Sequence, residues 1–269
     1  ILNGTSNFIF SKMADEKLSF DTALALAQKE GFAEPDPTFD ISGQDAAQKT
    51  SILATLSFFQ NSSMEKVYFE GIDKISPDDI DYGKQLNFVL KPLSVGMQNK
   101  DQITLGSFPA FVKTDSLLAS IQNENNAVLV NAENVGGTMY SGPGAGAKPT
   151  ANSVLSDVID IARGKIFDYG KFVEQNLSSS FDNFSCDRYL KLQVNDKPGV
   201  VAKISTLLAK NNLSIDNLIQ KELERSDDQI PLVIVLSNSD ETTIQETIKE
   251  LEALDEVSGP LTHIRILDI

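Results

Sequence analysis

The last third of the chain, residues 188–269, carries the most regular hydrophobic pattern in the sequence. Four short stretches rich in aliphatic residues are expected to form strands, at 189–194, 213–220, 230–236 and 261–267. Two stretches with apolar residues at helical spacing, 200–208 and 243–254, lie between them. The expected order of elements is therefore βαββαβ.

This order predicts a ferredoxin-like fold, in which a four-stranded antiparallel sheet carries both helices on one face. The first part of the chain mixes the alternating apolar pattern of strands with the helical spacing of apolar residues. There we expect helices near 3–13, 19–31, 42–60, 116–121 and 150–164, another starting at 76–77, and strands at 67–69, 88–97, 103–111 and 126–130. Residues 172–187 are rich in Ser, Asn and Asp and predict a linker. The prediction is an α+β protein with domains at 1–171 and 188–269, the first built on a mixed sheet with helices.

Charge and composition exclude several classes of function. Acidic residues outnumber basic ones 38 to 23, and a formal net charge of −15 repels a phosphate backbone, so no nucleic-acid partner is expected. Apolar runs are interrupted well before about 20 residues, which predicts no membrane span. The single cysteine, Cys186, excludes an internal disulfide. No cluster of His and Cys has the spacing of a zinc site, so no metal is expected, and the only histidine, His263, is expected to be structural.

Helix-boundary signals surround residues 31–45. Gly31 is placed to end a helix in the left-handed conformation. Pro35 and Pro37 are expected to keep the following segment extended. Ser42 is expected to cap the next helix, with Asp45 three residues later completing a variant of the capping box.

The densest polar cluster of the sequence lies on this loop and helix: Glu34, Asp36, Asp40, Asp45 and Lys49. Asp45 and Lys49 are four residues apart and share one helix face. Carboxylates can hold an ammonium group, and a lysine beside an aspartate can exchange a proton with a substrate oxygen, so the cluster suits a zwitterionic substrate. The alternative is a capped helix with a surface salt bridge of little energetic value.

A glycine-rich run, 142–150, precedes the helix that Thr150 or Asn152 is expected to cap. It is neither a Walker A loop nor a dinucleotide fingerprint, because Pro149 follows Lys148 and the glycine spacing fails. Small residues before a helix still let a flat or anionic ligand approach the backbone. A flexible turn explains the run equally well.

The turn from Asp196 to Gly199 begins the first helix of the C-terminal domain. Free backbone N–H groups near a helix N-terminus suit the carboxylate of an amino acid. A turn built from ordinary turn-forming residues is the alternative.

Three motifs together resemble the homoserine dehydrogenase family, whose members interconvert aspartate semialdehyde and homoserine with a nicotinamide cofactor. They are Leu2–Asn7, Gly31–Lys49 and Gly142–Asp157. The region from about 188 resembles an ACT domain, a small module that binds amino acids. The resemblance implies an α+β catalytic and dimerisation domain followed by an ACT domain.

The resemblance also implies roles for particular residues. Lys49 corresponds to the catalytic acid/base at the substrate oxygen, with Asp45 beside it. The remaining implied contacts are Glu34, Asp40, Gly4 and Thr5 with the substrate, Gly144 and Gly146 with NAD(P), and Asp196 and Gly199 with an amino-acid effector. Threonine is the usual effector in this family, which acts in threonine, methionine and isoleucine biosynthesis.

The family begins with a nucleotide-binding domain that these residues lack, so we expect the chain to be part of a longer protein and inactive alone. The apolar face of the helix at 150–163 is expected to stay exposed and to favour association. A homodimer or larger assembly in the cytoplasm is also implied. The alternative hypothesis is a non-catalytic amino-acid sensor.

Overall fold

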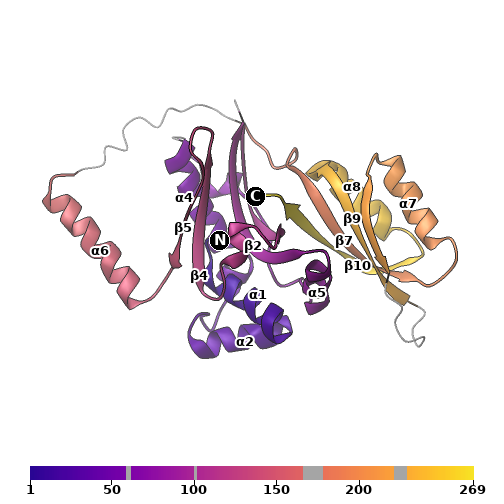
Figure 1. Cartoon of the computed structure of the whole chain (residues 1–269), viewed down its shortest axis with the longest axis horizontal. Helices are drawn as coiled ribbons and strands as arrows, with labels where there is room; N and C mark the ends of the chain where they lie inside the picture. The colour runs from indigo at the N-terminus through magenta and orange to yellow at the C-terminus, as the bar shows by residue number, and fades with distance from the viewer. Residues whose placement is uncertain (59–61, 100–101, 166–177, 221–228) are drawn as a thin grey trace.

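The computed structural model describes residues 1–58, 62–99, 102–165, 178–220 and 229–269 (Figure 1). Its helices are α1 (Gly4–Glu16), α2 (Phe20–Glu30), α3 (Thr38–Ile41), α4 (Gln44–Phe58), α5 (Pro77–Gln85), α6 (Ala147–Ala162), α7 (Val200–Lys210) and α8 (Glu241–Glu252), with short 3₁₀ turns at η1 (Met64–Lys66) and η2 (Leu117–Ser120). Its strands are β1 (Tyr68–Phe69), β2 (Phe88–Asn99), β3 (Gln102–Lys113), β4 (Asn125–Ala132), β5 (Gly136–Pro143), β6 (Ser178–Ser179), β7 (Ser185–Asn195), β8 (Ile215–Gln220), β9 (Gln229–Asp240) and β10 (Val257–Leu267). The α+β class is confirmed.

The C-terminal unit has the βαββαβ order that its periodicity predicts. Its strands lie in the order β10-β7-β9-β8 and every neighbouring pair is antiparallel. Both helices cover one face of this sheet (Figure 1). Alternate residues of β9, Leu232, Ile234 and Leu236, point to those helices and are fully buried. Period-two burial of this kind fixes the strand register, because a shift by one residue would expose the whole apolar set.

The other face of the same sheet packs against the N-terminal unit. Val233 and Val235 of β9 share a core with α1 and α2, together with Ile264 of β10 and Tyr189 of β7. The two units are also joined edge to edge, since β10 runs parallel to β3 with Arg265 opposite Ala110. Eight strands of the described ranges thus form one sheet, β1-β3-β10-β7-β9-β8 with β2 and β6 on β3. The sequence alone does not predict this shared sheet.

Several helix boundaries follow the sequence signals, whereas one predicted cap is wrong. Ser19 caps α2 through its side chain, and Gly31 ends that helix in the left-handed conformation at φ 82°. Ser42 instead closes the short helix α3, and its buried hydroxyl has no hydrogen-bond partner. The predicted capping box of Ser42 and Asp45 is not formed because the Asp45 carboxylate is held by Asn3 and Lys49.

The glycine-rich run differs from its expected form. Residues 136–143 form strand β5, which pairs with β4 in a two-stranded antiparallel hairpin. Helix α6 starts at Ala147, three residues before Thr150, with Gly146 at its N-cap and no side-chain cap. Cross-strand pairing over eight residues stabilises a strand that its many glycines disfavour.

Helix α6 stands apart from the rest of the chain in Figure 1, and none of its residues is buried. Its apolar side chains Val154, Leu155, Val158, Ile159 and Ile161 are exposed. No helix in the described ranges is both long enough and apolar enough to cross a membrane.

Part of the predicted linker, 172–177, lies outside the described residues. The end that is described packs on the N-terminal unit. Phe181 stacks on Tyr68 with ring centroids 4.3 Å apart, and Phe184 is buried. Strand β7 then begins at Ser185. The domain limits 1–171 and 188–269 remain predictions.

Candidate active site

The side chain of Asn3 joins the two carboxylates of the predicted site. Its Oδ1 accepts a hydrogen bond from the backbone N–H of Ser6 and caps α1. Its Nδ2 donates to Asp40 Oδ1 at 2.7 Å and to Asp45 Oδ2 at 2.8 Å. Both amide hydrogens are used, so Asn3 holds two like charges side by side without adding a positive charge.

Lys49 completes the group from the next turn of α4. Its Nζ donates to Asp45 Oδ2 at 2.6 Å and to the backbone carbonyl of Leu2 at 3.2 Å. The Lys49 side chain is 47 % exposed and that of Asp45 only 18 %. The Asp45 carboxylate and the Leu2 carbonyl thus hold the ammonium in place, while the exposed part of the Lys49 side chain remains open to solvent or a ligand.

A third segment meets the cluster from the β4–β5 hairpin. Asn126 donates its Nδ2 to the Leu2 carbonyl at 3.3 Å, and its Oδ1 is buried without a partner. A Cβ atom on Gly144 would lie 2.1 Å from that Nδ2, so only glycine leaves the Asn126 amide in place. The sequence predicts no role for Asn126, and it does not predict that Asn3 bridges two carboxylates. No local signal could have identified that bridge, because Asp40 and Asp45 lie 37 and 42 positions after Asn3.

The other predicted substrate residues have definite places. Thr5 is buried and its hydroxyl donates to the Phe32 carbonyl at 2.6 Å, which ties the loop after α2 to α1. Glu34 is exposed on that loop, and Gln28 Nε2 donates to its backbone carbonyl. Asp45 and Lys49 therefore contact each other directly, and Asn3 joins Asp40 to Asp45, whereas Glu34 lies on the loop that follows α2.

Gly146 has φ 116°, a conformation that L side chains rarely adopt, and an added Cβ would meet only Pro149 Cδ, at 3.7 Å. It leaves bare backbone between the hairpin and α6. Among the described residues, no three His, Cys, Asp or Glu side chains group as a metal site would require.

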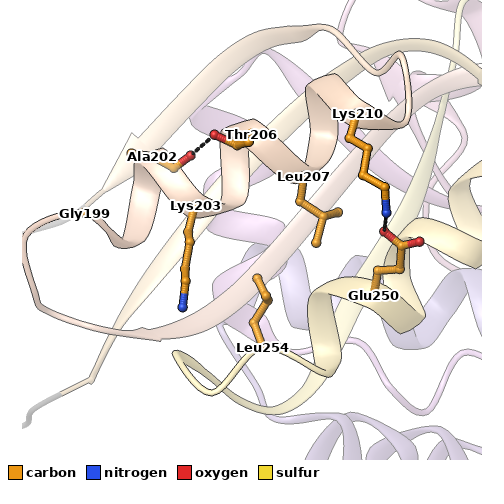
Figure 2. Close-up of a pocket in the computed structure, with 8 residues that line it drawn as sticks. All are labelled: Gly199, Ala202, Lys203, Thr206, Leu207, Lys210, Glu250 and Leu254. Carbon is orange, nitrogen blue, oxygen red and sulfur yellow. Dashed lines mark hydrogen bonds and ion pairs between the residues drawn. The ribbon is translucent and has the colours of Figure 1, made fainter.

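The predicted effector residues lie in the C-terminal unit. Gly199, with φ 94°, begins α7 and lines an open groove of about 600 Å³ between α7 and α8 (Figure 2). The other lining residues are Ala202, Lys203, Thr206, Leu207, Lys210, Glu250 and Leu254. Asp196 is exposed in the turn before Gly199 and does not line the groove.

Cys186 is buried, and His263 is half-buried on β10. Burial raises the pKa of the Cys186 thiol to about 11, which disfavours its reactive thiolate. Burial, aided by the charges of Arg265 and Arg188, holds the pKa of His263 well below its ordinary value. The Nε2 of His263 is buried without a partner. The neutral form of both groups is favoured by their surroundings.

Replacement of Gly4 tests how tightly the hairpin packs on the site. A Cβ on Gly4 would lie 2.6 Å from the backbone carbonyl oxygen of Glu124. Helix propensity alone would favour Gly4→Ala by up to about 1 kcal/mol. We expect the opposite sign, a loss of about 1–3 kcal/mol in the free energy of unfolding. The reason is that the backbone carbonyl oxygen of Glu124 cannot move away as the end of a flexible side chain can. Urea denaturation provides the measurement.

Gly142→Ala is the matched control, because an added Cβ there meets nothing within 4 Å. Its free energy of unfolding should change by no more than about 0.5 kcal/mol. Stabilisation by Gly4→Ala would show that the approach of Glu124 to α1 is not a close contact.

Comparisons with known proteins show which families the chain matches. Residues 1–159 match the family described as Homoserine dehydrogenase, and residues 188–256 match the ACT domain. The chain is 38 % identical over 277 residues to a homoserine dehydrogenase of Pseudomonas aeruginosa, covering 99 % of this chain and 64 % of that protein. It is 36 % identical over 269 residues to that of Bacillus subtilis, covering 96 % of this chain and 62 % of that protein.

Solved structures show the same likeness. A homoserine dehydrogenase from Thiobacillus denitrificans superposes with a TM-score of 0.90 at 34 % identity, over 100 % of this chain and 63 % of that one. One from S. aureus gives a TM-score of 0.76 at 29 % identity, over 100 % of this chain and 64 % of that one.

The fold and the site define an α+β protein that carries an ACT domain. The chain belongs to the homoserine dehydrogenase family. It spans under two thirds of the length of these relatives.

Proposed function

We propose that this chain carries the substrate-binding and proton-transfer part of an NAD(P)-dependent homoserine dehydrogenase, which interconverts L-homoserine and L-aspartate 4-semialdehyde. The observation that supports this proposal is the contact chain from Asp40 through Asn3 and Asp45 to Lys49. It offers negative charge for an amino group and a proton donor for an oxygen within one cluster. The alternative of a non-catalytic sensor is not favoured, because the dehydrogenase family covers residues 1–159.

Lys49 would exchange a proton with the substrate oxygen. In the reductive direction a hydride adds to the aldehyde carbon, and the Lys49 ammonium donates a proton to the oxygen, which leaves homoserine and a neutral amine. Asp45 and the Leu2 carbonyl orient that ammonium through the contacts described above. Proton transfer by a positioned side chain contributes typically about 10²–10⁴-fold in rate.

Glu34 and Asp40 would hold the substrate ammonium. Asp40 is fixed by Asn3, whereas Glu34 is exposed on a loop that Gln28 holds through two carbonyls, those of Glu34 and Pro35. A charge-assisted hydrogen bond from each would fix the amino-acid end of the substrate. Gly4 and Thr5 would border the same end as parts of the α1 N-terminus.

The nicotinamide supplies the hydride when bound. The residues present fit the approach of a flat ring, because Gly144 leaves bare backbone next to Asn126 and Gly146 leaves it at the start of α6. We propose that residues beyond this chain hold the nucleotide, and that these 269 residues alone show no turnover. We further propose that α6 packs through its exposed apolar side chains on that missing part.

The C-terminal unit would bind an amino-acid effector near Asp196 and Gly199, with threonine as the first ligand to test. The resemblance also supports a homodimer or larger assembly in the cytoplasm and a place in amino-acid biosynthesis. Calorimetry with threonine on the protein and on Gly199→Trp tests the effector site. Equal heats of binding for both would place the effector elsewhere.

Steady-state kinetics of the full-length protein test the substrate site. Glu34→Ala should raise the KM for homoserine by about 10- to 100-fold and change kcat less, because a hydrogen bond to a charged group contributes about 1.5–3 kcal/mol. Glu30→Ala is the matched control, since Glu30 is an exposed carboxylate at the end of α2. An equal KM for the two variants would remove Glu34 from the site.

A further inference from the structure

We infer that Arg265 and Glu70 are positioning residues through which the C-terminal unit fixes the segment that connects Asp40 to Asp45. The inference rests on the proposed function in one respect, that these carboxylates bind substrate. The geometry that carries it is a buried ion cluster at one end and a tight backbone contact at the other.

The ion cluster lies where β10 meets the N-terminal unit. Arg265 is fully buried and makes two hydrogen bonds to Glu241, at 2.6 and 3.1 Å. It also pairs with Glu70 at 2.8 Å and donates to the Tyr68 hydroxyl at 3.1 Å. Glu241 belongs to α8, whereas Glu70 and Tyr68 belong to the N-terminal unit, so one guanidinium joins the two units.

The position of Arg265 is itself tightly determined. The rings of Tyr68, Phe108 and Phe181 lie 4.9, 4.5 and 5.3 Å from its guanidinium carbon. Arg188 brings a second buried guanidinium to Glu241, at 2.7 Å. Burial would raise the pKa of Glu241, but its contact with Arg265 and the charge of Arg188 lower it to about 2. Glu241 therefore stays ionised and holds Arg265 in place.

The backbone of Glu70 links the fixed position of Arg265 to the segment beside the site. Its N–H donates to Ser107 of β3 at 2.9 Å. Its carbonyl oxygen lies 2.8 Å from the point where a Cβ on Gly43 would be. Two residues on, the N–H of Ile72 donates to the Ile41 carbonyl at 2.9 Å. Residues 70–72 thus run against residues 41–43 with no room between them.

Residues 41–43 connect the two functional carboxylates. Asp40 belongs to α3, which ends at Ile41, and Asp45 is the second residue of α4, which begins at Gln44. A shift of this connection would lengthen the Asn3 hydrogen bonds to both carboxylates. Displacements near 1 Å at an active site can reduce rates by about 100-fold, so a remote contact can matter.

The test is Glu70→Ala in the full-length enzyme. The Glu70 side chain is 28 % exposed, and Glu241 still compensates Arg265, so this variant should fold. We expect amide hydrogen exchange over residues 40–47 to become faster and the KM for homoserine to rise about 3- to 30-fold. Glu70→Gln, which restores an acceptor for Arg265, should recover most of both changes.

Lys191→Met is the matched control. Lys191 forms another ion pair between the units, 2.7 Å from the buried Asp79 of α5, and its other hydrogen bond goes to Ser76. It should lower thermal stability without changing exchange over residues 40–47 or the KM. Equal changes in the two variants, or unchanged exchange in Glu70→Ala, would overturn the inference. Amide hydrogen exchange does not depend on activity, so it tests this inference by itself. Failure of the proposed function would be seen in a different measurement, as unaltered turnover by Lys49→Ala.

Discussion

Lys49→Ala should reduce turnover of homoserine by the full-length protein about 10²- to 10⁴-fold, because it removes the side chain that we propose to move the substrate proton. Asp45 and the Leu2 carbonyl would stay in place, so the fold should not change. The KM should change less than kcat, since the carboxylates that we propose to bind the ammonium end remain.

The chain offers a matched control for this variant. Lys12 and Glu16 of α1 form an i,i+4 pair at 2.9 Å, the same spacing as Lys49 and Asp45. If Lys49 only made a surface salt bridge, Lys12→Ala and Lys49→Ala would behave alike, each changing stability by about 0.5 kcal/mol or less. Comparable turnover by the two variants would refute the role of Lys49. Thermal melts of both would check that they are folded.

Arg265→Met should lower the free energy of unfolding by about 3–5 kcal/mol, because it leaves Glu70 and part of the Glu241 charge uncompensated in a buried site. Lys113→Met is the control, since Lys113 pairs at 2.9 Å with the exposed Asp268 and should cost less than about 1 kcal/mol. Urea denaturation of both variants measures the difference. A cost for Arg265→Met equal to that of the control would show that the cluster adds no stability.

A double variant and a pH series test the contribution of the same ion cluster to stability. Arg265→Met with Glu70→Gln should recover part of the loss, because the second change removes the carboxylate that has lost its ion-pair partner, whereas Glu241 still pairs with Arg188. The pKa of Glu241 is about 2 in the fold against an ordinary 4.5. Its stabilising contribution is therefore present above about pH 4.5 and is lost as the pH falls toward 2. Arg265→Met should weaken this acid dependence.

The sequence predicted the C-terminal unit well because every signal there is local. Alternating apolar residues identified its strands, and helical spacing identified α7 and α8. Their order leaves few topologies once right-handed crossovers are required. The β5 strand was missed because Gly136 and Gly137 give no local strand signal, although both pair with residues of β4.

The candidate site was predicted in part. Asp45 and Lys49 share a helix face by spacing alone, and the structure confirms their contact. The Ser42 cap was wrong because Ser42 ends α3 in a helical conformation, and because Asn3, 42 positions before Asp45, takes the Asp45 carboxylate. A local capping contact and a contact with the distant Asn3 compete for the Asp45 carboxylate. The packing of the segments decides between them, and this packing cannot be inferred from the residues near Asp45.

The sequence by itself determined the α+β class, the βαββαβ unit, the helix that carries Asp45 and Lys49, and the family resemblance. Only the tertiary structure decided that Asn3 bridges two carboxylates, that Asn126 faces Gly144, and that Arg265 joins the units. The physical reason is that periodicity and caps depend on neighbours a few residues away. The pairing of β10 with β3 and the burial of Arg265 depend on residues more than 150 positions apart, such as Arg265 and Ala110.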